Sequence, residues 1–259
     1  MIMPHQVELR RLTSGDEDAV ARLHRVAVPE SERDMTVSGS PKLAAYVAAL
    51  VALPEYRGEH VFTGAFRGGE LVGYTHARLL PGRWHLNYVA VRPTCQGEGV
   101  GRALWAAWLR DGREWGLEVA SLDVLPKNTR VADWYRRRGL AEVATTWTCF
   151  ADGAPADQPA SGGQPDAKIA GWEEAEAWQR AYGFSRFKIE WGGGTWDVGR
   201  LPARYFSVAA EFPAALHGVL RAVDPKRAVV FTTHDKQRTQ GFNVARVSVR
   251  MEAALSQVV

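Results

Sequence analysis

The stretch Tyr88–Gly101, written YVAVRPTCQGEGVG, decides the fold that we predict for this chain. Its first four residues are apolar and typical of a strand, and it ends in a glycine-rich turn. From Val100 to about Trp115 apolar residues recur at four-residue spacing, which predicts a helix with one buried face. A strand, a glycine turn and a helix in this order point unpaired helix N–H groups at one spot, where the peptide dipoles favour negative charge. The stretch therefore predicts a phosphate-binding loop.

Several known types of phosphate-binding loop have to be compared with this stretch. A P-loop carries Lys and then Ser or Thr after its last glycine, whereas Gly101 is followed by Arg102. A dinucleotide-binding loop spaces its glycines G-x-G-x-x-G, which Gly97, Gly99 and Gly101 do not match. The pattern that remains is Gln-x-x-Gly-x-Gly, beginning at Gln96. A turn that merely connects a strand to a helix stays the structural alternative.

The Gln-x-x-Gly-x-Gly pattern resembles the acetyl-coenzyme A signature of the GNAT superfamily of N-acetyltransferases. A second signature of that superfamily is matched downstream by Asn128, Tyr135 and the pair Gly139-Leu140. Asn is a good N-cap and Gly a good residue just beyond a helix, so these positions also delimit a short helix. The resemblance covers residues from about 5 to 150.

The resemblance implies an α/β (α+β) fold with a mixed sheet, in which acetyl-CoA runs between a splayed fourth and fifth strand. Acetyl-CoA would be the co-substrate, and no metal is implied. The residues that the resemblance implies for acetyl-CoA binding are Val89, Val91, Gln96, Gly97, Glu98, Gly99, Val100, Gly101, Arg102 and Asn128.

The resemblance also implies direct attack of an acceptor amine on the thioester in a ternary complex. Tyr135 matches the tyrosine that would protonate the leaving thiolate, and a phenol and a thiol have pKa values close enough to share a proton. His85 stands where some members of the superfamily carry a glutamate base, and histidine titrates near neutrality. His76 is the reserve candidate for the base. The structural alternatives are a core aromatic at Tyr135, packed beside Val131, and half-buried strand histidines.

Composition sets broader bounds on the chain. Its 259 residues are 46% hydrophobic and 24% charged, which is typical of a globular protein with a real core. A net charge of +3 gives no reason to expect a nucleic-acid or membrane partner. Cys95 and Cys149 have neither a disulfide pattern nor metal-ligand spacing, which favours a reducing, cytoplasmic location. The N-terminus lacks an apolar signal core, and the apolar run Leu43–Leu53 is too short to cross a bilayer.

Local patterns predict the elements of the first 150 residues. Ser14 and Glu17 form a predicted capping box for a first helix, and a second is predicted from Ser40 to about Val51. Pro29–Ser40 between them is predicted to be a loop, whose carboxylates contact a cationic acceptor or are simply solvated. Strands are expected at Val7–Leu12, His60–Phe66, Leu71–Leu80, Trp84–Val91, Leu117–Leu125 and Ala141–Phe150.

The composition changes after residue 150. We predict a GNAT-like acetyl-CoA-binding catalytic domain at 1–150, a flexible linker rich in Gly, Pro, Ala and Ser at 151–167, and a smaller α+β domain at 168–259. The smaller domain is either a degenerate GNAT-like half without a phosphate loop or an unrelated α+β domain. Its predicted elements are helices at Gly171–Ala181 and Phe212–Val223, a hairpin around Gly192–Gly194, and strands at Arg227–Thr233 and Val244–Met251.

These observations favour an N-acetyltransferase that acts on a small-molecule or peptide amine. The alternative is a non-catalytic module that uses the same fold to bind acyl-CoA or a protein partner. A homodimer is compatible with either function.

Overall fold

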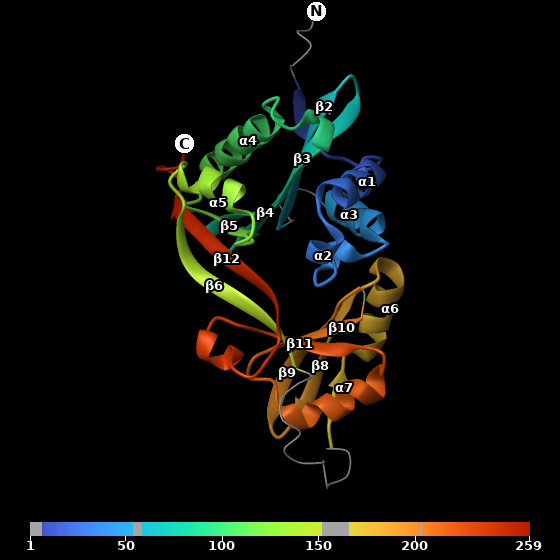
Figure 1. Ribbon diagram of the computed structural model, residues 1–259. Helices are drawn as coiled ribbons and strands as arrows, with labels where there is room; N and C mark the ends of the chain where they lie inside the picture. Colours follow the sequence, from blue (N-terminus) through green and yellow to red (C-terminus); the bar gives the residue numbers. More distant parts are fainter. Residues whose placement is uncertain (1–6, 54–58, 152–165, 203) are drawn as a thin grey trace, which may run out of the picture. The chain divides into compact units, whose positions relative to one another are not determined.

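A computed structural model describes residues 7–53, 59–151, 166–202 and 204–259 of the protein. Backbone contacts divide the chain into two units, and each is considered by itself (Figure 1). The first unit contains residues 1–30, 44–144 and 249–259, and the second contains residues 31–43 and 145–248. Most of the linker predicted at 151–167 lies outside the described residues.

The first unit is built on a mixed sheet. Its strands are β1 (Glu8–Arg11), β2 (His60–Arg67), β3 (Glu70–Leu80), β4 (Arg83–Val91), β5 (Val119–Val124) and the second half of β12 (Val244–Ala254), in this hydrogen-bonding order. Among the pairings of these described strands, β4 with β5 is parallel and the others are antiparallel. The connection between these two strands is a crossover helix, as parallel strands require.

Helices cover both faces of this sheet (Figure 1). One face carries α4 (Val100–Glu114) and α5 (Thr129–Arg136), and the other carries α1 (Glu17–Ala27) and α3 (Leu43–Val51). A short 3-10 helix, Pro93–Cys95, leads from β4 toward α4. The apolar spacing that predicted α4 is the one that the structure buries, since Val100, Leu104 and Trp108 are almost fully enclosed.

The main core of the first unit lies between α4, α5 and the strands β4, β5 and β12. Trp84 is fully buried there, and its indole N–H donates to the Trp108 carbonyl oxygen at 2.7 Å. The last described residues complete this core, because Met251, Leu255 and Val258 are buried in it. Gly112 is required on α4, since a Cβ there would lie 2.5 Å from the Trp84 ring.

Two local predictions for the first helices are wrong. Asp16, and not Ser14, is the N-cap of α1, and its carboxylate accepts from the Thr13 backbone N–H at 2.9 Å and from Arg10 at 2.7 Å instead of capping the helix. The segment predicted as a loop at Pro29–Ser40 contains the short helix α2 (Glu30–Arg33) and a 3-10 turn at Val37–Gly39. Short polar helices of this kind lack the apolar periodicity that a sequence pattern needs.

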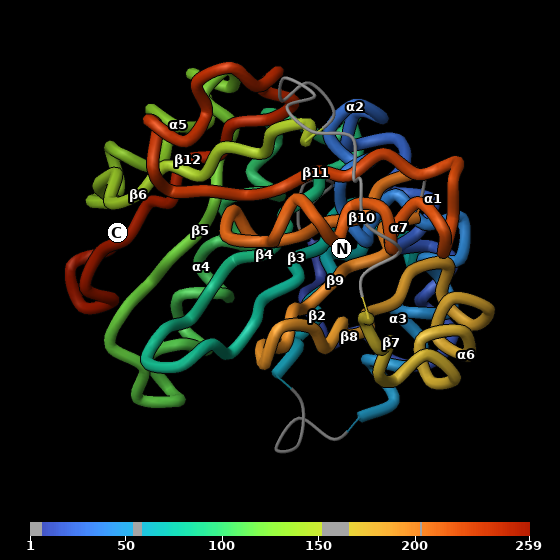
Figure 2. Tube along the Cα trace, turned by 90° about the horizontal axis from the view of Figure 1, so that it is seen from below, coloured from blue at the N-terminus to red at the C-terminus, as the bar shows by residue number. Residues whose placement is uncertain are grey.

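The second unit has its own strands (Figures 1 and 2) and its own hydrophobic core. Its strands follow the hydrogen-bonding order β6 (Ala141–Phe150), β11 (Ala228–Thr233), β10 (Tyr205–Ala209), β9 (Gly194–Arg200), β8 (Ser185–Trp191) and β7 (Lys168–Ala170). The helices are α6 (Trp172–Tyr182) and α7 (His217–Val223), with 3-10 turns at Ala214–Leu216 and Lys236–Thr239. The helix predicted from Phe212 is therefore divided into a 3-10 turn and a shorter α-helix.

The second unit repeats one feature of the first. β10 and β11 pair in parallel, with α7 between them in sequence, as α4 stands between β4 and β5. The turn that precedes its helix lacks the glycines of the first unit and holds Phe212, which is buried and stacks on His217 with ring centroids 5.9 Å apart. The connection between β10 and α7 thus carries a buried aromatic residue, whereas the connection between β4 and α4 carries open glycines.

Candidate functional site

The loop between β4 and α4 has the geometry that its sequence predicts. Gly97 and Gly99 have φ values of +83° and +88°, in the left-handed region that glycine adopts without strain. Gly99 is the N-cap of α4, and no atom lies within 4 Å of a Cβ built on either glycine. No side chain therefore crowds these two glycines, and the first turn of the 15-residue helix that follows has N–H groups without intrahelical acceptors, which suit an anion.

The side chains around this loop leave that space clear. Gln96 folds back and donates from Nε2 to the Val91 carbonyl oxygen at 3.2 Å. The Glu98 carboxylate is held by Arg67 at 2.7 Å. Val100 is buried beneath the loop, and a Cβ on Gly101 would sit 3.7 Å from Val91. The loop thus presents backbone rather than side chains.

Cations lie beside the start of α4. Arg138 stacks on the Trp134 ring at 3.4 Å, and its pKa is lowered by burial and by the neighbouring charges of Arg102 and Arg137. Within the described ranges none of these three arginines has a carboxylate at ion-pair distance. A cluster of positive charges without carboxylate partners attracts an anionic ligand.

The strands β4 and β5 separate beyond a short paired stretch. They are in register only from Arg83 to Leu86 on β4, opposite Val119 to Leu122 on β5. Just beyond, the pairing of β4 with β3 shifts, and Asn87 is the extra residue of the resulting bulge. Val89 and Val91 follow on the part of β4 that has no register with β5, and Val89 is 38% exposed. This opening is where the splayed strands were predicted.

The two predicted catalytic residues lie on opposite faces of the sheet. Tyr135 belongs to the core that contains Trp84 and Leu86, whereas His85, between those two residues on β4, points to the other face. Tyr135 and His85 therefore lie on opposite sides of the strand β4.

Tyr135 is 6% exposed and packs against Trp105 and Trp134, with ring centroids 5.5 Å and 5.2 Å away. Burial raises its pKa, so the phenol stays protonated at neutral pH. In the part of the chain that the structure describes, its hydroxyl has no hydrogen-bond partner. Asn128, the other signature residue on α5, is exposed at the N-cap and makes no side-chain capping bond.

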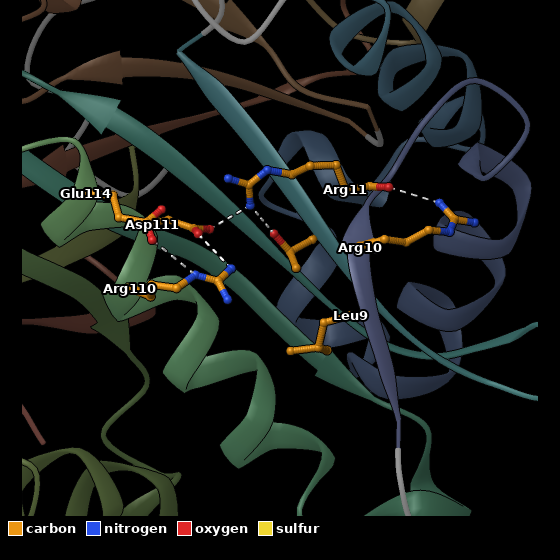
Figure 3. A pocket seen from close by; sticks show the side chains of 7 residues that line it. Leu9, Arg10, Arg11, Arg110, Asp111 and Glu114 are labelled. Atoms are coloured by element: carbon orange, nitrogen blue, oxygen red, sulfur yellow. Dashed lines mark hydrogen bonds and ion pairs between the residues drawn. The ribbon is translucent and has the colours of Figure 1, made fainter. Parts of the chain in front are cut away.

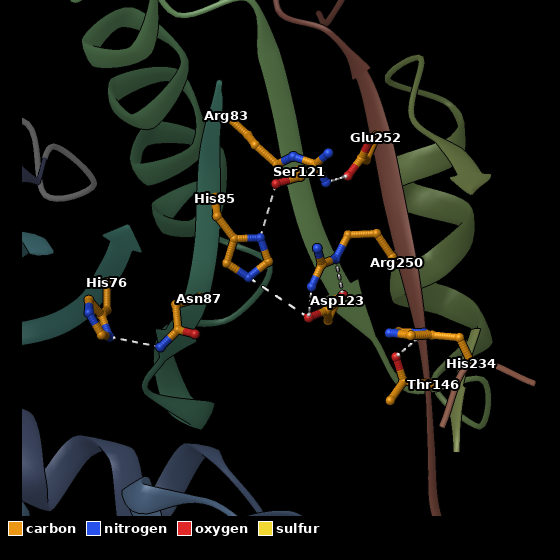
Figure 4. A network of polar contacts seen from close by, with 10 residues as sticks. All are labelled: His76, Arg83, His85, Asn87, Ser121, Asp123, Thr146, His234, Arg250 and Glu252. Carbon is orange, nitrogen blue, oxygen red and sulfur yellow. Dashed lines mark hydrogen bonds and ion pairs between the residues drawn. The ribbon is translucent and has the colours of Figure 1, made fainter. Parts of the chain in front are cut away.

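His85 is buried and hydrogen-bonded (Figure 4). Its Nδ1 lies 3.0 Å from Ser121 Oγ, and its Nε2 lies 3.9 Å from Asp123, which itself pairs with Arg250 at 2.6 Å. Burial lowers the pKa of His85 to about 4, against the opposing attraction of Asp123. The imidazole is therefore neutral at neutral pH.

Two further histidines, His60 on β2 and His76 on β3, lie near His85. His76 Nδ1 is 3.1 Å from the Asn87 amide nitrogen, and His76 Nε2 is 2.8 Å from His60 Nδ1. The sequence points to His76 but not to His60 or Asn87, because no sequence pattern marks the bulge that brings Asn87 to this face.

A cavity of about 450 Å³ lies elsewhere on the first unit, beside the second half of α4 (Figure 3). Its charged side chains are held in ion pairs: Asp111 is buried and pairs with Arg11 at 2.6 Å and with Arg110 at 3.1 Å, and Arg10 pairs with Asp16 at 2.7 Å. The network links β1 to α4, and we assign it a structural role.

The described residues contain no group of three or more His, Cys, Asp or Glu side chains placed to hold a metal ion. Cys95 and Cys149 are free and buried. Among the helices of the described ranges, none is long and apolar enough to span a membrane.

Comparison with protein families finds a known domain whose residues lie mostly in the first unit. Residues 30–140 match the model of the acetyltransferase (GNAT) family. A mycothiol acetyltransferase of Streptomyces scabiei (strain 87.22) is 39% identical over 83 residues, which are 31% of this chain and 27% of that protein. The chain thus matches only about a quarter of that relative's length.

Solved structures resemble nearly the whole chain. A tandem GNAT protein from the clavulanic acid biosynthesis pathway matches with a TM-score of 0.67 and 15% identity, over 96% of this chain and 99% of that one. A GCN5-related N-acetyltransferase from Sphaerobacter thermophilus matches with a TM-score of 0.60 and 16% identity, over 98% of this chain and 97% of that one. These similarities confirm the predicted mixed-sheet fold with a GNAT-like first unit, and they extend the likeness through the second.

Proposed function

We propose that this chain transfers an acetyl group from acetyl-CoA to an amine, because residues 30–140 match the model of the GNAT acetyltransferase family. The observation that carries the proposal is the open glycine loop at the start of α4, with Gly97 and Gly99 in left-handed conformations and nothing above them. Backbone N–H groups and the helix dipole at such a loop suit a diphosphate. Acetyl-CoA would supply an activated acetyl group as a thioester.

The cofactor-binding residues divide into two groups in this proposal. Gln96, Gly97, Glu98, Gly99, Val100 and Gly101 hold the diphosphate through their backbone, and Arg102 adds positive charge beside it. Val89, Val91 and Asn128 contact the pantetheine arm along the opening between β4 and β5. The unpaired backbone of β4 supports this arrangement, because it can donate to the amide groups of that arm and to the thioester oxygen as negative charge develops there.

Tyr135 and His85 move the protons in the proposed reaction. The acceptor nitrogen forms a bond to the acetyl carbon while the carbon–sulfur bond breaks, and the sulfur leaves with that electron pair. Tyr135 gives its proton to the sulfur, which its raised pKa permits because the phenol is protonated at neutral pH. His85, neutral at neutral pH, accepts the proton that the amine loses.

A non-catalytic acyl-CoA-binding module is the second candidate. The low pKa of His85 favours it, because a group with a pKa of about 4 is a weak base at neutral pH. Calorimetry with coenzyme A tests binding, and release of free thiol from acetyl-CoA tests transfer with a panel of amines (spermidine, an aminoglycoside, an amino acid ester and a lysine-containing peptide). Binding without thiol release would support the module, and no binding would exclude both candidates.

A charge in the glycine loop is expected to weaken coenzyme A binding. In Gly99→Asp the added carboxylate lies at the N-terminus of α4, where it suits the helix but repels a diphosphate. We expect the Kd for coenzyme A to rise at least about tenfold, equivalent to roughly 1.4 kcal/mol. Isothermal titration calorimetry measures the change.

Gly82→Asp is the matched control for Gly99→Asp. Gly82 also has a positive φ, +70°, with open space around its Cβ, but it lies in the turn between β3 and β4. Its substitution should leave the Kd unchanged. Equal effects of the two substitutions would remove the loop from the binding site.

The pH dependence of turnover tests His85. A base acts when deprotonated, so kcat should fall as pH falls through about 4, the pKa of His85, and not near the ordinary histidine value. His85→Gln, which can still hydrogen-bond to Ser121, should lower kcat about 10²-fold and remove this acid limb. Unfolding must be monitored at each pH. An acid limb that stays in place in the variant excludes His85 as the base.

A further inference from the structure

A hydrogen-bonded chain crosses three neighbouring strands on the face of the sheet opposite Tyr135. It runs from Asn87 on β4 to His76 on β3 at 3.1 Å, and from His76 to His60 on β2 at 2.8 Å. The His76 ring is stacked against Phe62, with centroids 4.2 Å apart and planes 7° from parallel, and against Tyr88 at 6.0 Å. Packing against Phe62 and Tyr88 therefore fixes the orientation of the His76 ring, which links Asn87 to His60.

The hydrogen bonds from Asn87 to His76 and from His76 to His60 all donate in the same direction. An amide nitrogen can only donate, so Asn87 donates to Nδ1 of His76, and the remaining proton of a neutral His76 is on Nε2. That Nε2–H then donates to Nδ1 of His60. Burial lowers the pKa of both histidines, which keeps them neutral and preserves this direction.

The result is a carboxamide with a fixed orientation and one unused acceptor. Because the nitrogen of Asn87 faces His76, its Oδ1 points away from that ring, as Figure 4 shows. No residue of the described ranges hydrogen-bonds to this oxygen, and it is not enclosed. Asn87 is the bulge residue at the point where β4 loses its pairing with β5, two positions after His85.

We propose that Oδ1 of Asn87 accepts a hydrogen bond from an N–H of the acceptor amine and thereby orients it for attack. His76 is a positioning residue that holds the carboxamide, and His60 fixes the tautomer of His76. A primary amine suits this site, since it keeps one N–H for Asn87 after it gives a proton to the base. The inference rests on the proposed acetyl transfer and names the acceptor class of that same site.

Kinetics of Asn87→Ala and His76→Phe test the inference in the full chain. Loss of one hydrogen bond to the amine should raise the KM for the most active amine of the panel roughly tenfold in Asn87→Ala. His76→Phe keeps the ring stack but frees the carboxamide, and should raise the same KM by a smaller factor. Neither variant should change the Kd for coenzyme A, since neither residue lies at the glycine loop. An unchanged acceptor KM in Asn87→Ala would overturn the proposal, as would a fall in kcat alone.

A measurement that does not depend on turnover tests the hydrogen bonds between Asn87, His76 and His60. Nitrogen-15 NMR of the imidazoles should show His76 and His60 both as Nε2–H tautomers, and Asn87→Asp should reverse the tautomer of His76, because a carboxylate can only accept. Where Asn87→Ala does not fold, Asn87→Ser serves for the kinetics. If the unmodified protein neither binds coenzyme A nor releases thiol, acetyl transfer fails. If it does both and Oδ1 proves irrelevant to KM, only the role of Asn87 fails.

Discussion

Replacing Tyr135 with Phe is expected to lower kcat about 10²- to 10⁴-fold, the contribution typical of a positioned general acid. The ring is held between Trp105 and Trp134, so removal of the hydroxyl alone should leave the packing intact. The Kd for coenzyme A should stay the same, because the glycine loop is unchanged. Steady-state thiol release and calorimetry measure the two quantities.

Tyr74→Phe is the control for this experiment. Tyr74 is also buried with a raised pKa, but its hydroxyl lies 2.6 Å from Nδ1 of His24 on α1. Loss of that contact should lower stability by about 1 kcal/mol and leave turnover intact in the folded protein. Nearly full turnover in Tyr135→Phe would exclude the acid role and leave Tyr135 as a core residue.

Replacing Trp84 with Ala is expected to lower the free energy of unfolding by about 3–5 kcal/mol. The side chain is 0% exposed and packs against Trp115 with ring centroids 5.1 Å apart. Truncation would also leave the Trp108 carbonyl oxygen without the indole N–H that it accepts. Urea denaturation followed by tryptophan fluorescence and circular dichroism measures the change.

Trp178→Ala on α6 is the matched control, since Trp178 is 43% exposed. Its removal should cost well under half as much, because nearly half of the side chain is already in contact with solvent. Equal losses at the two positions would contradict the claim that complete burial makes the removal of Trp84 costly.

Local patterns predicted the elements that define the first unit. The four-residue spacing within α4 and the glycines before it depend on neighbouring residues, so they appear in the sequence. The fold class was confirmed for the same reason, since a strand, a glycine turn and a crossover helix restrict the topology strongly. The role of each residue in the loop stays a prediction that the proposed experiments test.

Long-range pairing could not be predicted in the same way. A strand near Val244 was expected, but nothing in its sequence indicates that its second half pairs with β5 in the first unit. The bulge at Asn87 is likewise a property of how β3 and β4 align and not of either strand alone. The failed capping box at Ser14 has a local cause instead, because the helix begins two residues later, at the N-cap Asp16, whose carboxylate pairs with Arg10.

The return of β12 has a consequence for how this protein is made. The second half of β12 pairs with β5, which ends before residue 125, and Arg113 donates to the carbonyl oxygens of Leu255 and Val258. On the ribosome the family-matched segment therefore emerges long before the strand that seals it. The first unit must wait, with β5 uncovered, through the synthesis of the entire second unit, so the order of translation is not the order in which folding can finish.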